Sequence, residues 1–179
     1  MAIFTEQHPG VDTHVPPETS GFTLNHTMLR IKAPERSLAF YSHVFGLRVL
    51  RKLDFPEMQF TLYFLARVDV DETVPDEIGE RTTWTFSRRG VLELTHNWGT
   101  ENQPDFAYHD GNAEPQGFGH ICFSVPDLST AMHWLESNQV EFVKRPEDGK
   151  MKNVAFVKDP DGYWIEIVEP ALMSKMGQG

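Results

Sequence analysis

Residues 158–170, with the sequence KDPDGYWIEIVEP, decide the fold. Their Asp-Pro-Asp-Gly segment predicts a turn, and residues 163–168 after it predict a short strand. Side chains alternate between the two faces of a strand, so Glu166 shares a face with Trp164 and Val168. Burying a carboxylate on such an apolar face is unfavourable unless a partner or a metal receives its charge. Glu166 therefore requires a cationic or metal partner elsewhere in the chain.

The chain before this stretch repeats one plan twice, strand–helix–strand–strand–strand, which is the signature of an internal repeat. In the first half, strands are expected over residues 22–31, 47–50, 59–66 and 90–95, with residues 82–87 (TTWTFS) resuming the sheet. The first helix is expected to begin at Pro34 and to stop at Gly46. In the second half, strands are expected over residues 118–125, 140–144, 154–157 and 163–168, with a helix capped by Asp127.

Each half carries a histidine in its first strand and a glutamate in its last strand. These are His26 and Glu93 in the first half and His120 and Glu166 in the second. The same ligand types at equivalent positions of a repeat predict one metal site shared by the two halves. Neutral imidazole and carboxylate suit zinc, nickel, cobalt or iron(II), and the lack of thiolates argues against a purely structural zinc site. Four ligands on a six-coordinate metal would leave room for two water or substrate oxygens, as an enediolate requires.

The composition excludes several classes of function. The chain has 179 residues, a net charge of −10 and 40% apolar residues, so it has neither a basic surface for nucleic acid nor a polybasic segment for a membrane. No stretch reaches the roughly 18 apolar residues of a membrane helix, and the first residues do not form a signal peptide. The single cysteine, Cys122, excludes an intrachain disulfide and fits a reducing compartment. We expect a cytoplasmic protein.

The organisation predicted from these patterns is an α+β protein of two tandem βαβββ modules with curved mixed sheets. Residues 1–20, rich in Pro, Thr and Glu, are expected to form a flexible arm. The first module is expected over residues 21–100, with a polar insertion at about 67–81, and a linker over 101–116. The second module and a C-terminal tail are expected over residues 117–179.

The sequence resembles the glyoxalase I (lactoylglutathione lyase) family of the vicinal oxygen chelate superfamily over residues 22–176. The resemblance rests on HTMLRIKAPERSLAFYSHVFGL, DFPEMQFTLYFLA, LELTHNWGTE, GFGHICFSVPD, FVKRPEDGKMK and DPDGYWIEI. It implies the fold of that superfamily and the isomerisation of the hemithioacetal of methylglyoxal and glutathione to S-lactoylglutathione, a detoxification reaction.

The resemblance also implies roles for particular residues. The metal ligands would be His26, Glu93, His120 and Glu166, with Glu166 as the base that removes the C1 proton and Glu93 as the second acid or base, around a metal-held enediolate. The glutathione contacts would be Arg30, Asn97, Lys144, Lys150 and Met151, and the apolar pocket would be Phe55, Phe60, Leu62 and Met173. Many relatives have Arg just before the GFGH motif, where this chain has Gln116. Either Arg30 suffices there, or Arg145 substitutes, or affinity is reduced.

The resemblance further implies a homodimer whose sites each combine the first module of one subunit with the second module of the other; a self-contained monomer is the alternative. The polar stretches at about 67–81 and 101–116 resemble the longer, zinc-preferring branch of the family, so zinc is favoured, with nickel or cobalt possible. Two other functions compete with the isomerase. An iron(II) extradiol dioxygenase would use two histidines and one carboxylate, so the fourth ligand argues against it. A ligand-sequestering module of the same fold would lack the metal ligands.

Overall fold

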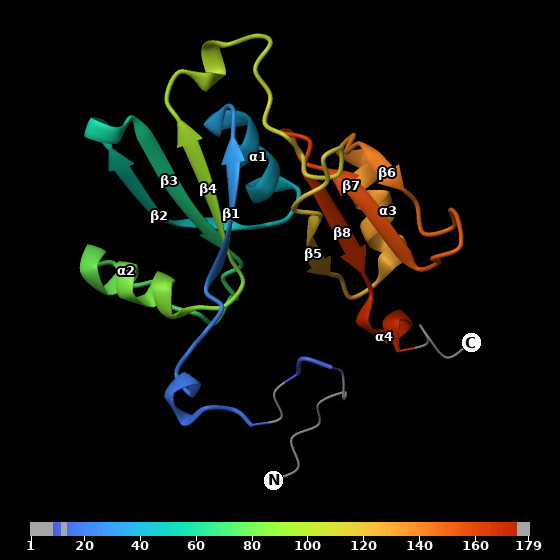
Figure 1. Ribbon diagram of the computed structural model, residues 1–179, viewed down its shortest axis with the longest axis horizontal. Helices are drawn as coiled ribbons and strands as arrows, with labels where there is room; N and C mark the ends of the chain where they lie inside the picture. The colour runs from blue at the N-terminus through green and yellow to red at the C-terminus, as the bar shows by residue number, and fades with distance from the viewer. Residues whose placement is uncertain (1–8, 12–13, 175–179) are drawn as a thin grey trace.

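Two four-stranded mixed sheets form the framework of the computed structural model, which describes residues 9–11 and 14–174 (Figure 1). The strand orders are β1-β4-β3-β2 in sheet A and β5-β8-β7-β6 in sheet B. Sheet A contains β1 (His26–Ile31), β2 (Arg48–Phe55), β3 (Phe60–Ala66) and β4 (Val91–Asn97). Sheet B contains β5 (His120–Ser124), β6 (Phe142–Lys144), β7 (Val154–Lys158) and β8 (Trp164–Val168). In each sheet the first and last strands pair in parallel and the other pairs are antiparallel, which confirms the predicted repeat and fold class.

The helices α1 (Pro34–His43) and α3 (Leu128–Ser137) follow the first strand of each sheet. Proline fits the first position of α1 because its fixed φ suits a helix start, where no backbone N–H is needed. The Asp127 side chain caps α3 by accepting a hydrogen bond of 2.7 Å from the Thr130 amide. A short helix, α4 (Pro170–Met173), follows β8, and short 3-10 helices are η1 (Pro17–Thr19), η2 (Pro56–Met58) and η3 (Thr100–Asn102).

One hydrophobic core joins the helix-covered faces of both sheets. In β8, Ile165 and Ile167 are buried, while Trp164, Glu166 and Val168 are only half-buried, as the alternation predicted. Ile165 and Ile167 belong to one cluster of buried apolar residues that also contains residues of α1, α3 and sheet A. In Figure 1, α1 lies between the two sheets. Because these inner faces share one core, the opposite faces of the two sheets point away from it.

Polar contacts also connect the two halves. The Tyr41 hydroxyl in α1 donates a buried hydrogen bond of 2.8 Å to Asp159, in the turn between β7 and β8. Asp161 of the same turn accepts hydrogen bonds from the Ser37 hydroxyl at 2.7 Å and from the Lys32 amide at 2.9 Å. The Asp-Pro-Asp-Gly segment thus forms the predicted turn and also attaches sheet B to α1.

Replacing Tyr41 with Phe is expected to destabilise the protein by about 1.5–3 kcal/mol, because Tyr41 is fully buried and donates to a carboxylate. Denaturant unfolding of the variant and the wild type measures the change. Tyr63→Phe is the control, since no hydrogen bond of the Tyr63 hydroxyl is found within the described residues and its removal should cost little. Equal losses in the two variants would contradict the role given to Tyr41.

The burial of Asp159 predicts a pH dependence of stability. Burial raises the pKa of Asp159 to about 6, with its hydrogen bonds opposing the shift. Because the folded state holds this proton more tightly than the unfolded chain, the contribution of Asp159 to stability falls as pH rises from about 4 to about 6 and is then constant. Relative to Asp159→Asn, the wild type should lose on the order of 3 kcal/mol across this range. Unfolding curves of both proteins at several pH values measure the difference, and a pH-independent difference would contradict it.

The strand expected over residues 82–87 is wrong, because these residues lie in a helix, α2 (Ile78–Ser87). The Glu77 side chain caps this helix by accepting from the Glu80 amide at 2.7 Å. Its threonine hydroxyls donate to the carbonyl four residues before them, as Thr82 does to Ile78 and Thr85 to Arg81. Within the described residues, the first half therefore has a helix between its last two strands, and the second half has none between β7 and β8.

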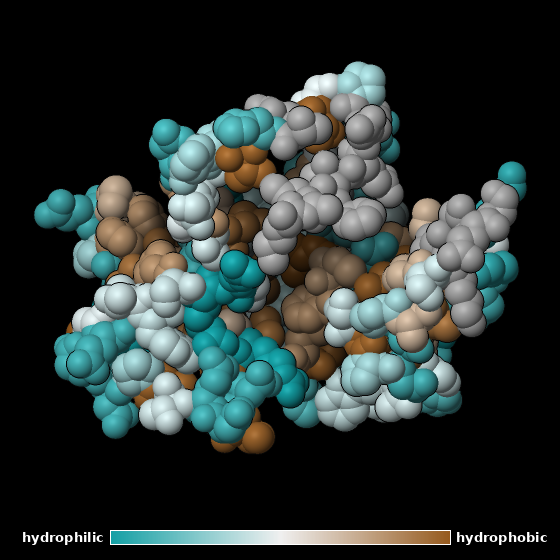
Figure 2. Space-filling view, turned by 90° about the horizontal axis from the view of Figure 1, so that it is seen from below, coloured by the Kyte–Doolittle hydropathy of each residue, from teal (hydrophilic) through white to brown (hydrophobic). Residues whose placement is uncertain are grey.

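Smaller differences concern the ends of elements. β2 continues to Phe55, past the predicted residue 50, and β4 continues through His96 to Asn97, where the strand was expected to end at residue 95. Of the predicted arm, residues 1–8 and 12–13 lie outside the described residues, as do residues 175–179 of the predicted tail. Seen from below, apolar side chains line a hollow near the middle of the molecule (Figure 2). In the described part of the chain, no helix is long and apolar enough to cross a membrane.

Candidate metal and substrate site

The four predicted metal ligands form two pairs, one on each sheet. In sheet A, His26 Nε2 lies 3.0 Å from a carboxylate oxygen of Glu93. In sheet B, His120 Nε2 lies 3.3 Å from a carboxylate oxygen of Glu166. Ligand atoms that bind one ion at about 2.0–2.2 Å are themselves about 3 Å apart, so each pair is spaced as two neighbouring ligands of one metal would be.

The two pairs occupy equivalent positions in their sheets. In sheet A, Glu93 is opposite Met28, two residues after His26 on the parallel strand. In sheet B, Glu166 is opposite Cys122, two residues after His120. Each histidine and glutamate therefore face the same side of their sheet, one step apart on neighbouring strands. The two sheets therefore share the relative positions of their histidine and glutamate, and not only the residue types.

A phenylalanine completes this geometry in each sheet, and the sequence reasoning missed both. Phe64 on β3 is opposite Glu93, and Phe156 on β7 is opposite Glu166. Each phenylalanine meets its histidine edge to face, with ring centroids 5.6 Å apart for His26 and 5.3 Å apart for His120. Aligning the third strands of the two halves would have revealed this repeated aromatic position. The rings restrict how each imidazole can turn.

The two carboxylates differ in their surroundings. The Glu93 side chain is 12% exposed, and its other oxygen accepts a hydrogen bond of 3.0 Å from the Thr95 hydroxyl. The Glu166 side chain is 21% exposed and lies beside the Cys122 thiol. Burial, together with the neighbouring Glu166 carboxylate, raises the pKa of the Cys122 thiol to about 12, so this thiol stays protonated at neutral pH. Glu93 is thus the less exposed of the two and accepts from a hydroxyl, whereas Glu166 accepts from a thiol, which is a weaker donor.

The structure brings the ligands together as two pairs and not as a group of four. Among the described residues, no three His, Cys, Asp or Glu side chains are grouped closely enough to hold one metal ion. Both pairs lie on the sheet faces that point away from the shared core, and both are partly open to solvent. The donors of each pair fit a divalent metal in kind and spacing.

The predicted glutathione contacts are divided between the same two regions. Arg30 is exposed on the same face of β1 as His26, and the Asn97 amide donates to the Tyr108 hydroxyl at 3.0 Å at the end of β4. Lys144, at the end of β6, donates to the backbone carbonyl of Val154 at 2.6 Å. Lys150 and Met151 lie in the exposed loop between β6 and β7, and Gln116 is exposed before β5.

The predicted apolar pocket residues also follow this division. The register places Phe55, Phe60 and Leu62 on the face of sheet A that carries Glu93. Phe55 and Phe60 stack with their centroids 4.7 Å apart. Met173 belongs to α4, which follows sheet B. An apolar surface thus adjoins the His26 and Glu93 pair, and Met173 lies on the other half of the chain.

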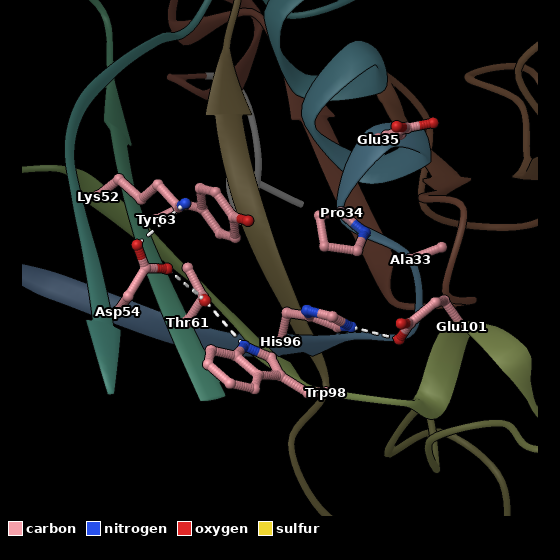
Figure 3. Close-up of a pocket in the computed structure, with 10 residues that line it drawn as sticks. All are labelled: Ala33, Pro34, Glu35, Lys52, Asp54, Thr61, Tyr63, His96, Trp98 and Glu101. Atoms are coloured by element: carbon pink, nitrogen blue, oxygen red, sulfur yellow. Dashed lines mark hydrogen bonds and ion pairs between the residues drawn. The ribbon is translucent and has the colours of Figure 1, made fainter. Parts of the chain in front are cut away.

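A pocket of about 770 Å³ lies on the opposite face of sheet A, and it contains none of the four candidate ligands (Figure 3). The pocket is lined by Tyr63 of β3 and by His96 of β4. The residues before and after His96 in β4 point to the face that carries Glu93. His96 is buried and its Nε2 lies 2.7 Å from Glu101. Trp98 Nε1 donates to Thr61 at 2.9 Å at the same pocket. The contact with Glu101 thus holds the His96 ring at the wall of this pocket.

Comparison with known proteins gives consistent results. Residues 23–167 match the model of the Glyoxalase/Bleomycin resistance protein/Dioxygenase superfamily. The chain is 55% identical to a lactoylglutathione lyase of Pseudomonas aeruginosa over 179 residues, which is 100% of both chains. It is 50% identical to glyoxalase I of Saccharomyces cerevisiae over 146 residues, which is 81% of this chain and 44% of the yeast protein. Among solved structures, the trypanothione-dependent glyoxalase I of Leishmania major has a TM-score of 0.62 and 30% identity, covering 86% of this chain and 91% of that one.

Proposed function

The chain belongs to the Glyoxalase/Bleomycin resistance protein/Dioxygenase superfamily, and we propose that it is a lactoylglutathione lyase, the enzyme also called glyoxalase I. Its reaction is the isomerisation of the hemithioacetal of methylglyoxal and glutathione to S-lactoylglutathione. The substrate is thus a glutathione adduct, and the reaction removes methylglyoxal. The cytoplasmic location remains a prediction from the sequence.

The observation that carries this proposal is the repeated His–Glu pair. Two pairs with the same strand register, similar spacings of 3.0 and 3.3 Å and the same type of aromatic neighbour give a set of two imidazoles and two carboxylates. A dioxygenase of the same fold would need only two histidines and one carboxylate, so the second carboxylate favours the isomerase. A ligand-sequestering module would need neither pair.

His26, Glu93, His120 and Glu166 are the residues that would hold the divalent metal. When bound, the metal supplies a Lewis acid that stabilises negative charge on the substrate oxygens. The donor set of nitrogen and oxygen atoms, without thiolate, suits zinc and also nickel or cobalt. We favour zinc because the polar stretches at about 67–81 and 101–116 resemble the longer, zinc-preferring branch of the family.

The chain's own carboxylates would move the protons. Glu166 is the better candidate for the base at C1, because its side chain is the more exposed of the two and lacks a hydroxyl partner like that of Glu93. Glu93, fixed by Thr95, would return or hold the proton on the opposite side of the substrate. A general base must lie within hydrogen-bond reach of the proton that it removes. In a site shared by two chains, both residues would face the substrate.

A homodimer would complete the site. The two pairs of one chain lie on faces that point away from their common core, so the sheet A pair would be joined by the sheet B pair of a second copy. Apolar side chains flank both pairs, as Met28 and Phe86 do near His26 and Phe118 does near His120. Exposed apolar groups of this kind are typical of a surface that another chain covers.

The remaining predicted contacts would hold the substrate across this interface. Arg30 and Asn97 from one chain would bind the γ-glutamyl end of glutathione. Lys144, with the loop that contains Lys150 and Met151, would bind the glycyl carboxylate from the other. Phe60 and its neighbours on sheet A would contact the methyl group of the aldehyde.

The direct test follows thioester formation from methylglyoxal and glutathione with the purified protein. Appearance of S-lactoylglutathione supports the proposal. Oxygen consumption with a catechol, in place of thioester formation, would support the dioxygenase. Ligand binding without either turnover would support a sequestering module.

A further inference from the structure

The side chain of Asn25, the residue before the ligand His26, makes three hydrogen bonds. Its amide nitrogen donates to the backbone carbonyl of Thr85 at 3.1 Å and to that of Arg88 at 2.9 Å. Its amide oxygen lies 2.7 Å from Nδ1 of His26. Thr85 is in the last turn of α2 and Arg88 follows directly after it. Asn25 therefore connects the end of α2 to the imidazole ring.

These contacts determine which way the Asn25 amide faces. A backbone carbonyl can only accept a hydrogen bond, so the atom next to Thr85 and Arg88 must be the amide NH₂. The other amide atom is then the oxygen, which can only accept, so the proton between it and His26 belongs to Nδ1 of the ring. A reversed amide would place its oxygen against two carbonyl oxygens. The network fixes a single arrangement.

The consequence for His26 is that its other nitrogen is directed at the site. With Nδ1–H given to Asn25, Nε2 is the atom that faces Glu93 at 3.0 Å. Phe64 and Phe86 pack edge to face against the same ring, 5.6 and 6.2 Å from it. The ring is thus held by one hydrogen bond and two aromatic neighbours before any metal binds.

The second half lacks this arrangement. Within the described residues, no hydrogen bond to Nδ1 of His120 is found, and no helix corresponds to α2 between β7 and β8. The His120 side chain is also more exposed than that of His26, at 40% against 33%. The helix specific to the first half therefore serves one of the two histidines only.

We propose that Asn25 is a positioning residue for the metal, which fixes the Nδ1–H form of His26 and its orientation through the end of α2. This rests on the proposed function, because it takes His26 as a metal ligand. Residues that do not bind the metal themselves but hydrogen-bond to the second nitrogen of a metal-binding histidine typically contribute about 10- to 100-fold to metal affinity. Asn25 should supply most of this contribution in the sheet A half of the site.

The test measures zinc affinity by competition with a chromogenic chelator. Asn25→Ala removes the acceptor and should weaken zinc binding about 10- to 100-fold. Asn25→Asp keeps an acceptor oxygen for His26 but loses the amide donors to Thr85 and Arg88. Because the ring keeps its acceptor but loses the anchor on α2, the zinc affinity of this variant should lie between that of the wild type and that of Asn25→Ala, and its unfolding free energy should fall. Ser87→Ala, which removes an exposed hydrogen bond to Trp84 in the same turn of α2, is the matched control and should bind zinc normally.

A second readout follows the proton itself. In zinc-loaded protein labelled with ¹⁵N-histidine, the Nδ1–H resonance of His26 should be visible and slow to exchange, and Asn25→Ala should abolish this protection. Unchanged zinc affinity in Asn25→Ala would overturn the inference and leave the proposed function intact. Equal loss of affinity in the Ala and Asp variants, in step with stability, would reduce Asn25 to a structural role. Failure of the wild type to bind zinc, nickel or cobalt would overturn both.

Discussion

Replacing Glu166 with Gln is expected to lower kcat for the hemithioacetal by about 10³-fold, with a smaller change in KM. General base catalysis contributes typically 10²- to 10⁴-fold, and a neutral amide removes the base. The amide oxygen also remains a weaker metal ligand at nearly the same position. The variant should therefore fold normally and keep part of its metal, while the proton at C1 has no acceptor. Steady-state kinetics with metal content measured on the same sample separate the two effects.

Glu141→Gln is the matched control for this variant. Glu141 pairs with Lys158 at 2.6 Å on an exposed part of the same half of the chain, so its replacement should leave kcat within about twofold. Glu93→Gln shows which carboxylate is the base. If the loss of kcat is much larger for Glu93→Gln than for Glu166→Gln, the two roles are exchanged. Retention of kcat within tenfold in Glu166→Gln would contradict its assignment as the base.

Two inactive variants are expected to produce an active heterodimer. The first carries His26→Ala and Glu93→Gln, and the second carries His120→Ala and Glu166→Gln. Each variant alone should have no measurable activity, because both sites of its homodimer lack one ligand pair. In the heterodimer, one site combines the two altered pairs and the other combines the two intact pairs. Its specific activity should therefore be roughly half that of the wild type, by the two-fold symmetry of the assembly.

The experiment co-expresses the two variants with different affinity tags and isolates the heterodimer on both tags in turn. A wild-type protein with the same two tags gives the reference activity. If each site were built within one chain, both sites of the heterodimer would be broken and no activity would return. An inactive, folded and metal-exposed heterodimer would thus contradict the proposed shared site.

The fold was predictable where buried and exposed side chains alternate along a strand and where the plan of strands and helix repeats. Ile165 and Ile167 are buried on one face of β8 and Glu166 lies on the other, as the alternation required. The repeat predicted the same plan of strands and helix in both halves, and the two sheets have corresponding strand orders. The TTWTFS segment misled because β-branched and aromatic residues favour strands in general. Its helix depends on contacts that lie outside the segment, such as the Glu77 cap and the packing of Trp84 on sheet A.

The candidate site was predictable as a set of residues but not as an arrangement. His26, Glu93, His120 and Glu166 stand out by position in the repeat, whereas the separation of the two pairs follows from the packing of both halves on one core. That packing includes the contact of Tyr41 with Asp159, two residues far apart in sequence. The role of Asn25 was equally hidden, because it depends on the end of a helix that the sequence did not predict.

The most direct test of the shared metal site is reconstitution of metal-free protein with zinc, following thioester formation from methylglyoxal and glutathione. We predict no activity after treatment with chelator and a linear recovery that reaches its plateau at one zinc per chain. Recovery with nickel alone would keep the reaction and change the metal. Full activity in metal-free protein, or no thioester from folded protein loaded with zinc, nickel or cobalt, would contradict the account.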